Sequence, residues 1–168
     1  MTKRQFSFLA IMALVAGLPR TGVAAALSFK TYTLGITTRA EVAKTAPDCG
    51  GDSFYCLGPP DTIAGVPTSR VELYFLDRVL ERVRVTFPSS ACGPVIGALR
   101  EKFGTPDAEI PTANERIPNQ ARPRHIRWNQ ADGGAVIFSA PRGELEASVA
   151  FTSSRWRSQS ETITNQDL

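Results

Sequence analysis

Three cysteines and a single histidine have the widest chemical repertoire in this sequence: Cys49, Cys56, Cys92 and His125. Together they could form a four-ligand zinc site, but the ligands of structural zinc sites usually occur in closely spaced pairs. Only the first two cysteines are close in the sequence, and no second pair accompanies them. We therefore predict no metal site and no bound cofactor.

The loop between Cys49 and Cys56 is suited to a disulfide bond. Gly50 and Gly51 follow the first cysteine, and glycine readily adopts the backbone conformations that a tight turn needs. An odd number of cysteines leaves one of the three outside a single bridge. We predict a Cys49–Cys56 disulfide, and a bond from either residue to Cys92 is the alternative.

The short motifs that identify the common catalytic classes are absent from the sequence. It contains no Gly-x-Ser-x-Gly, no His-Glu-x-x-His, no phosphate-binding loop and no glycine-rich dinucleotide fingerprint. Strand alternation places His125 on the face opposite Ile126 and Trp128, so we interpret it as a solvent-facing residue. Cys92 begins a predicted helix, whose positive end could activate a thiol. A cysteine-dependent enzyme is therefore kept as an alternative, but we predict no catalytic residue.

Two surfaces are candidates for binding a partner. The first is a polar face of the predicted sheet that combines charges with an aromatic side chain, a mixture typical of interface hot spots. Its members are Arg70, Glu72, Tyr74, Arg82, Arg84, His125 and Arg127. The second is the loop Cys49–Asp61, which would display Phe54 and Tyr55. The simpler interpretations are a solvated sheet face for the first surface and aromatic rings folded back over the core for the second.

The first 26 residues are typical of an export signal. Lys3 and Arg4 form a positive start, Phe6–Leu18 form an apolar segment, and small residues end at Ala26. The apolar segment is shorter than the roughly 20 residues that cross a bilayer. We predict cleavage near Ala26 and a periplasmic or secreted product without a transmembrane segment. An oxidising compartment would then allow the disulfide to form.

Removing this signal changes the charge of the chain. The full sequence has 19 Lys and Arg against 16 Asp and Glu, and Lys3, Arg4 and Arg20 lie in the signal. Without them the two numbers are equal, so the charge does not favour nucleic acid as a partner. About 142 residues remain, enough for one domain with its own core. We place this domain at residues 27–152, followed by a polar, flexible tail at 153–168.

Helix and strand signals alternate along the domain. Thr38 and Glu41 form a capping box for a helix that cannot pass Pro47. A second helix starts near Cys92-Gly93-Pro94 and stops at Gly104. Alternating apolar and polar residues predict strands at 62–66, 70–76, 79–87, 124–129, 135–140 and 144–152, with an optional edge strand at 27–34. The last strand would bury Leu145, Ala147, Val149 and Phe151.

A helix followed by a three-stranded meander thus occurs twice, in about 30–87 and 88–152. Val83, Val85 and Phe87 in the first half correspond to Ala147, Val149 and Phe151 in the second. The two meanders would join into one antiparallel sheet with both helices on the same face. The predicted fold class is α+β.

The sequence resembles the SmpA/OmlA (BamE-like) and β-lactamase-inhibitor-protein-like superfamily. The resemblance rests on Gly35, Thr37, Glu41 and Val42 at the first helix, on Phe103, Gly104 and Pro106 after the second, and on Trp128 and Gly133–Phe138 in later strands. It covers roughly residues 30–152. The cleavage site has no lipid-accepting cysteine, unlike outer-membrane members. The resemblance implies an envelope protein that binds other proteins, and no functional residue is carried across.

These patterns favour a non-catalytic extracytoplasmic, periplasmic protein-interaction module. Its partner would be another envelope protein, whose identity the sequence does not reveal. A small-ligand or lipid-binding periplasmic domain is the alternative.

Overall fold

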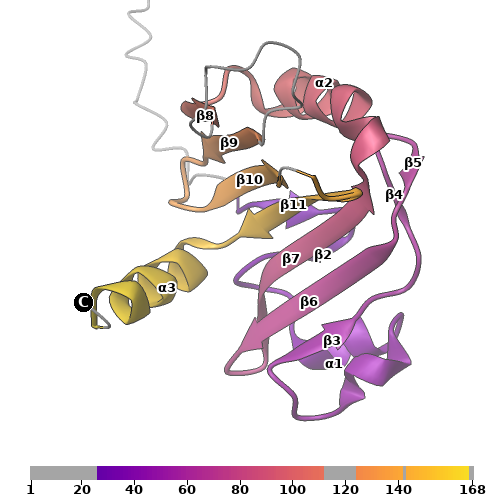
Figure 1. Cartoon of the computed structure of the whole chain (residues 1–168). Coiled ribbons are helices and arrows are strands. Elements are labelled where there is room, and N and C mark those ends of the chain that lie inside the picture. The colour runs from indigo at the N-terminus through magenta and orange to yellow at the C-terminus, as the bar shows by residue number, and fades with distance from the viewer. Residues whose placement is uncertain (1–25, 112–123, 142, 167–168) are drawn as a thin grey trace, which may run out of the picture.

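A computed structural model describes residues 26–111, 124–141 and 143–166. The chain is α+β, and its described part contains a seven-stranded antiparallel sheet (Figure 1). In spatial order the strands are β3 (Tyr55–Leu57), β6 (Arg70–Leu76), β7 (Val79–Pro88), β11 (Glu146–Thr152), β10 (Ala135–Ala140), β9 (Arg124–Asn129) and β8 (Ala108–Pro111). The predicted signal peptide, residues 1–26, lies outside the described residues except for Ala26.

Two short hairpins and three α-helices complete the described structure. The hairpins are β1 (Ser28–Phe29) with β2 (Tyr32–Thr33), and β4 (Thr62–Ile63) with β5 (Val66–Pro67). The helices are α1 (Arg39–Ala43), α2 (Cys92–Phe103) and α3 (Ser154–Gln166), and 3₁₀ turns occupy Pro47–Gly50 and Ser89–Ala91. None of the helices in the described ranges is long and apolar enough to cross a bilayer.

One face of the sheet is apolar and forms the core, as the alternation in β6, β7 and β11 predicts. Val83, Val85 and Phe87 are completely buried, and they pair across the strands with Phe151, Val149 and Ala147. Leu145 was predicted to join this row, but it is 86% exposed because β11 begins only at Glu146. We call the core side the inner face and the opposite side the outer face.

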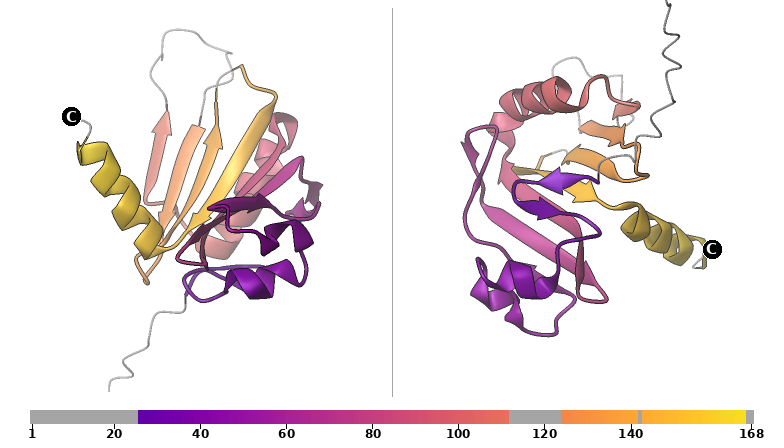
Figure 2. Two further views of the ribbon diagram at one scale, coloured as in Figure 1. Left: turned by 90° about the horizontal axis from the view of Figure 1, so that it is seen from below. Right: turned by 180° about the vertical axis from the view of Figure 1, so that it is seen from behind.

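Helices α1 and α2 both contact the inner face. In α1, the Arg39 guanidinium lies 4.3 Å from the ring centre of Phe75. At the end of α2, the Phe103 ring lies 6.3 Å from that of Phe151. Figure 2 shows the β1–β2 hairpin on this side as well, and the Phe29 ring is 5.1 Å from Phe151. The N-terminal segment, expected as an optional edge strand, instead forms a hairpin over the core.

The first predicted meander is wrong in one strand. Residues 62–66 do not join the sheet, because Ala64 and Gly65 have φ angles of 52° and 75° and turn the chain into the β4–β5 hairpin. The position beside β6 is taken by β3, which lies in the segment expected to be a loop. Strand β8 was also missed. The predicted Asp77-Arg78 turn is confirmed, and both residues have positive φ angles, as a type I′ turn requires.

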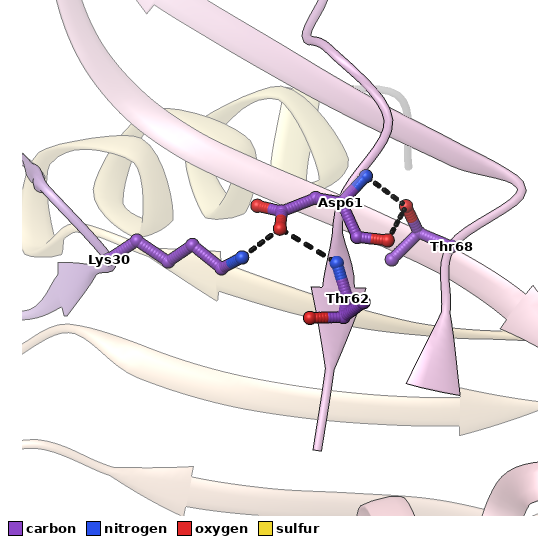
Figure 3. A network of polar contacts seen from close by, with 4 residues as sticks. All are labelled: Lys30, Asp61, Thr62 and Thr68. Atoms are coloured by element: carbon purple, nitrogen blue, oxygen red, sulfur yellow. Dashed lines mark hydrogen bonds and ion pairs between the residues drawn. The ribbon is translucent and has the colours of Figure 1, made fainter. Parts of the chain in front are cut away.

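A polar network attaches the β4–β5 hairpin to the N-terminal hairpin (Figure 3). The Lys30 ammonium pairs with the Asp61 carboxylate, which also accepts the Thr62 amide at 2.7 Å. The Asp61 amide donates to the Thr68 hydroxyl at 3.1 Å, and that hydroxyl donates to the Asp61 carbonyl at 3.0 Å. The segment between β3 and β6 is thereby closed into an ordered loop.

The residues after Thr152 were expected to form a flexible tail, but they form helix α3. The Ser153 hydroxyl accepts the Trp156 amide at 3.1 Å, which is the hydrogen bond of a helix N-cap. Arg155 pairs with Asp77 and, at 3.5 Å, with Glu81. Glu81 is only 1% exposed and also accepts the Ser153 hydroxyl. The start of α3 is therefore fixed to β7 and to the β6–β7 turn.

Candidate interaction surface

Four aromatic rings and one guanidinium gather on the outer face near the edge of the sheet. The ring centres of Phe54 and Tyr55 are 5.1 Å apart. The Tyr74 ring centre lies 6.3 Å from that of Phe54 and 5.9 Å from that of Tyr55. Tyr74 lies 5.5 Å from Trp156. The Arg82 guanidinium is 5.4 Å from the Tyr74 ring centre and 5.7 Å from that of Trp156. We call Phe54, Tyr55, Tyr74, Arg82 and Trp156 the aromatic cluster.

Strand register explains why these residues meet. Tyr55 in β3 is paired with Tyr74 in β6, and Tyr74 is paired with Arg82 in β7. Directly paired residues share a face, so all three side chains lie on the outer face. Trp156 reaches them from the first turn of α3. The two candidate surfaces predicted from the sequence thus meet in one place.

The loop that carries Phe54 and Tyr55 is closed by the predicted disulfide. Cys49 and Cys56 are bonded, with their Cα atoms 5.2 Å apart. Both cysteines are buried, whereas Phe54 is 63% and Tyr55 is 41% exposed. The rings therefore do not fold back over the core, which was the simpler interpretation of this loop.

Arg39 fixes the backbone of the same loop from the inner side. This side chain is 7% exposed, and it donates hydrogen bonds to the carbonyl oxygens of Cys49, Gly51 and Ser53. The Phe54 carbonyl in turn accepts the Phe75 amide at 2.8 Å. Charge-assisted hydrogen bonds of this kind are stronger than neutral ones. The backbone that carries the exposed rings of Phe54 and Tyr55 is therefore held in place by hydrogen bonds.

Arg82 is the electrostatically unusual member of the cluster. Among the described residues, the buried Nε of Arg82 has no hydrogen-bond partner and no carboxylate forms an ion pair with the guanidinium. Burial lowers the pKa of the Arg82 guanidinium, and the neighbouring Tyr74 partly opposes that shift. Burial also raises the pKa of Tyr74, with a second contribution from the charge of Glu72.

The remaining interaction candidates on β6 and β7 lie beside the aromatic cluster. Glu72 and Arg84 are paired residues and form an ion pair of 3.8 Å. With Arg70 they line a small hollow of about 90 Å³, whose far side includes Glu144 and Glu146. This polar hollow borders the aromatic cluster on the same face, because the outward residues of β6 and β7 form one continuous surface.

His125 and Arg127 share the outer face but not the cluster. They lie on β9, and strands β11 and β10 separate β9 from β7. His125 Nδ1 is 3.1 Å from the Ser139 hydroxyl, and Arg127 donates to the Asn129 side chain at 2.9 Å. The two residues therefore share the predicted face with Arg70, Glu72 and Tyr74, but they do not cluster with them, because two strands lie between β9 and β7.

The cysteine alternatives are settled by the same disulfide. Cys49 and Cys56 are bonded to each other, so neither is a thiolate ligand for zinc nor bonded to Cys92. In the described part of the chain no group of three metal-binding side chains comes together. Cys92 begins α2 as expected and is partly buried.

Sequence reasoning missed three residues that position the site. Arg39 and Glu81 are charged and lie at positions where the sequence pattern does not reveal burial. Trp156 was assigned to the tail, although Ser153 three residues earlier is a helix-capping residue type. A capping-type residue directly after the last strand is the signal that could have revealed α3.

No match for this chain was found among protein-family models, curated proteins or solved structures. Its function is therefore inferred from the surface described above.

Proposed function

We propose that this protein is a non-catalytic, extracytoplasmic protein-interaction module that contacts its partner through the aromatic cluster. The observation that carries the proposal is the combination of exposed rings with a fixed backbone. Phe54 and Tyr55 are exposed, and the loop beneath them is held by the disulfide and by Arg39.

Such a surface suits protein binding for two physical reasons. Tyrosine, tryptophan and arginine contribute most of the energy at protein interfaces. A backbone that is ordered before binding loses less conformational entropy when the partner arrives. Leu57 is 52% exposed and lies on the same face as Tyr55, so the apolar area continues along β3.

The proposed location outside the cytoplasm rests on the N-terminal signal pattern. The Cys49–Cys56 bond supports it, because structural disulfides persist mainly in oxidising compartments. In the periplasm or outside the cell, the partner would be another envelope or secreted protein. The resemblance to the BamE-like superfamily favours the same role.

We also propose that the sheet arose from a repeated helix-and-meander unit. Strands β7 and β11, which end the first and the second half, are neighbours at the centre of the sheet. The two corresponding sets of the sequence repeat pair there in reverse order: Val83 with Phe151, Val85 with Val149 and Phe87 with Ala147. Under this proposal the aromatic cluster belongs to the first half together with α3.

Affinity capture tests the proposed surface. The mature protein would be immobilised and exposed to envelope extract, and recovered proteins would be quantified for wild type and for a Phe54→Ala/Tyr55→Ala variant. We expect reproducible partners with the wild type and a loss of at least tenfold with the variant, since two hot-spot side chains are removed.

An Ile36→Ala/Leu145→Ala variant is the matched control. Ile36 and Leu145 are 64% and 86% exposed and lie outside the aromatic cluster. Removing them deletes a similar amount of exposed apolar surface elsewhere. Equal losses with both double variants, or capture that neither variant changes, would contradict a binding role for the aromatic cluster.

A further inference from the structure

We propose that helix α3 is a displaceable cover of the aromatic cluster: it opens from the sheet and lifts the Trp156 ring off Tyr74 and Arg82, so that an apolar side chain of the partner takes the place of that ring. This inference rests on the proposed interaction function and adds its regulation. We call the arrangement in the structure the closed state and the lifted arrangement the open state.

Three consecutive residues of the first turn attach α3 to the sheet. Arg155 forms ion pairs with the β6–β7 turn and with β7, and Trp156 contacts the aromatic cluster. Arg157 donates to the Gly133 carbonyl at 2.8 Å. Residues 158–160 are exposed, and the helix then leads away from the sheet (Figures 1 and 2). Opening therefore breaks contacts near one end of the helix.

The strand that precedes α3 stays paired when the helix opens. Ser153 continues the ladder between β11 and β7, because its amide donates to the Glu81 carbonyl at 2.9 Å. The first residue that can turn without breaking this ladder is Ser154. An isolated helix of 13 residues is marginal in water, so α3 loses its internal hydrogen bonds in the open state.

Arg82 opposes the closed state. A side chain on a sheet face is flanked by its neighbours in the sheet and is covered only by residues that lie above that face. Tyr74 is the neighbour of Arg82 in β6, whereas Trp156 reaches the guanidinium from outside the sheet. In the closed state Nε of Arg82 is shielded from solvent, and among the described residues it has no acceptor. A buried donor without an acceptor is unfavourable, and opening returns this one to water.

The contacts of the closed state compensate for this burial only in part. The Arg82 guanidinium lies 5.7 Å from the Trp156 ring centre, close to the limit of about 6 Å for a cation–π interaction. The Arg155 side chain is 44% exposed, and ion pairs of exposed side chains contribute little. Weak contacts thus hold α3 closed against the cost of an unpaired buried donor.

Trp156 also indicates what takes its place on the cluster. Its ring is an apolar group that packs beside Tyr74 and Arg82, so an aromatic or aliphatic side chain of the partner fits the same position. Phe54 and Tyr55 are exposed in the closed state and offer the first contact. A partner that needs the open state binds with an affinity reduced by the fraction of open molecules.

Hydrogen exchange of α3 in two variants of β7 tests the role of Arg82. Arg82→Met keeps an apolar stem beside Trp156 but removes the buried donor, so the α3 amides should exchange about fivefold more slowly than in the wild type. Arg84→Met is the matched control, because Arg84 lies on the same face of the same strand and pairs with Glu72. It should leave α3 exchange unchanged. Faster or unchanged α3 exchange in Arg82→Met would overturn the inference, and protected amides in β10 and β11 verify that each variant is folded.

A variant of Arg155 tests the opening without altering the cluster. Arg155→Gln removes the ion pairs of the first turn, so α3 exchange should become about threefold faster. Tetranitromethane nitrates accessible tyrosines, and its reaction with Tyr74, measured by peptide mapping relative to Tyr32, should accelerate by the same factor. Arg100→Gln removes a surface ion pair of the same kind in α2 and should change neither rate.

The outcomes separate this inference from the proposed function. Unchanged nitration of Tyr74 in Arg155→Gln would overturn the inference and leave the interaction role standing. In the envelope capture experiment, Arg155→Gln should recover more of the partners that require Phe54 and Tyr55, and an equal or smaller amount would overturn the regulation by α3. The Phe54→Ala/Tyr55→Ala comparison decides the interaction role independently.

Discussion

Arg39 shows how one buried charge can organise a recognition loop. It lies in a helix of only five residues, packs over Phe75 and donates to three carbonyl oxygens of the Cys49–Cys56 loop. Those carbonyls are near the start of the loop, where the backbone has no strand partner. The side chain therefore supplies hydrogen bonds that a sheet would otherwise provide.

Replacing Arg39 with methionine should destabilise the protein and release the loop. Arg39→Met keeps a long apolar stem but removes all donors, so we expect the free energy of unfolding to fall by about 2–4 kcal/mol. Urea unfolding measures this change, and hydrogen exchange at residues 50–54 should become faster. The exposed Arg70→Met control should change stability by less than about 0.5 kcal/mol. An unchanged exchange rate in the loop would contradict the role assigned to Arg39.

Tyr74 should report the burial of the aromatic cluster through its ionisation. Burial raises its pKa above the ordinary 10.0, so an unfolded chain would ionise this tyrosine first. Its contribution to stability is full below pH 10 and is lost as the pH rises through the folded pKa. The difference between absorbance titrations of wild type and Tyr74→Phe isolates this step. A midpoint at or below 10 would show that Tyr74 is more hydrated than the structure indicates.

At the scale of elements, helix α1 depends on its cap more than on its length. Five residues are too few for a stable isolated helix. Thr38 accepts the Glu41 amide, and the Glu41 carboxylate accepts the Thr38 amide at 2.7 Å and its hydroxyl at 2.8 Å. These contacts, led by the Thr38 backbone amide, lower the pKa of Glu41.

Removal of the Thr38 hydroxyl should loosen this helix. Thr38→Ala should cost about 1 kcal/mol of unfolding free energy, as for other N-caps, whereas Thr38→Ser should remain close to wild type. The Glu41 pKa, measured by NMR titration, should rise in Thr38→Ala but stay lowered in Thr38→Ser. Because the folded pKa is lowered from 4.5, the contribution of Glu41 is present above that pH and is lost as the pH falls through the folded value. Equal Glu41 pKa values in both variants would show that the Thr38 hydroxyl does not bind the Glu41 carboxylate, whereas the hydrogen bond from the Thr38 backbone amide is present in both.

The elements also show which structural features are encoded locally. Strands β6, β7 and β11 were predictable because their burial alternates along the sequence, and the Thr38 capping box was predictable because its contacts span three residues. Strand β3 was not, because its three residues are placed by a disulfide and by Arg39 from another element. Four of the five cluster residues were predicted as interaction candidates, but their meeting was not, because it depends on the position of β3, and Trp156 was missed because it depends on the position of α3.

At the scale of the whole molecule, the start of the described chain contacts the turn between β9 and β10, in the second half of the sheet. The Leu27 amide donates to the Asp132 carboxylate at 2.9 Å, across more than a hundred residues of sequence. Leu27 is 5% exposed, and Asp132 also accepts the Gly134 amide at 2.8 Å in the turn between β9 and β10. The predicted signal cleavage site after Ala26 directly precedes this contact.

Cleavage at that site should convert this hydrogen bond into an ion pair. The Leu27 nitrogen would become a charged α-ammonium group, which binds a carboxylate more strongly than a neutral amide does. In a protein that begins at Leu27, Asp132→Asn should therefore lower the unfolding free energy by about 1–2 kcal/mol more than the same change in a protein that begins at Val23. Urea unfolding of both chain lengths, each with Asp132 and with Asn at this position, measures the difference in unfolding free energy. The intact mass of the exported product establishes the cleavage position. Because the substitution alters the contact to Gly134 in the same way in both backgrounds, an equal effect of Asp132→Asn in the two lengths would show that the new terminus makes no ion pair with this turn.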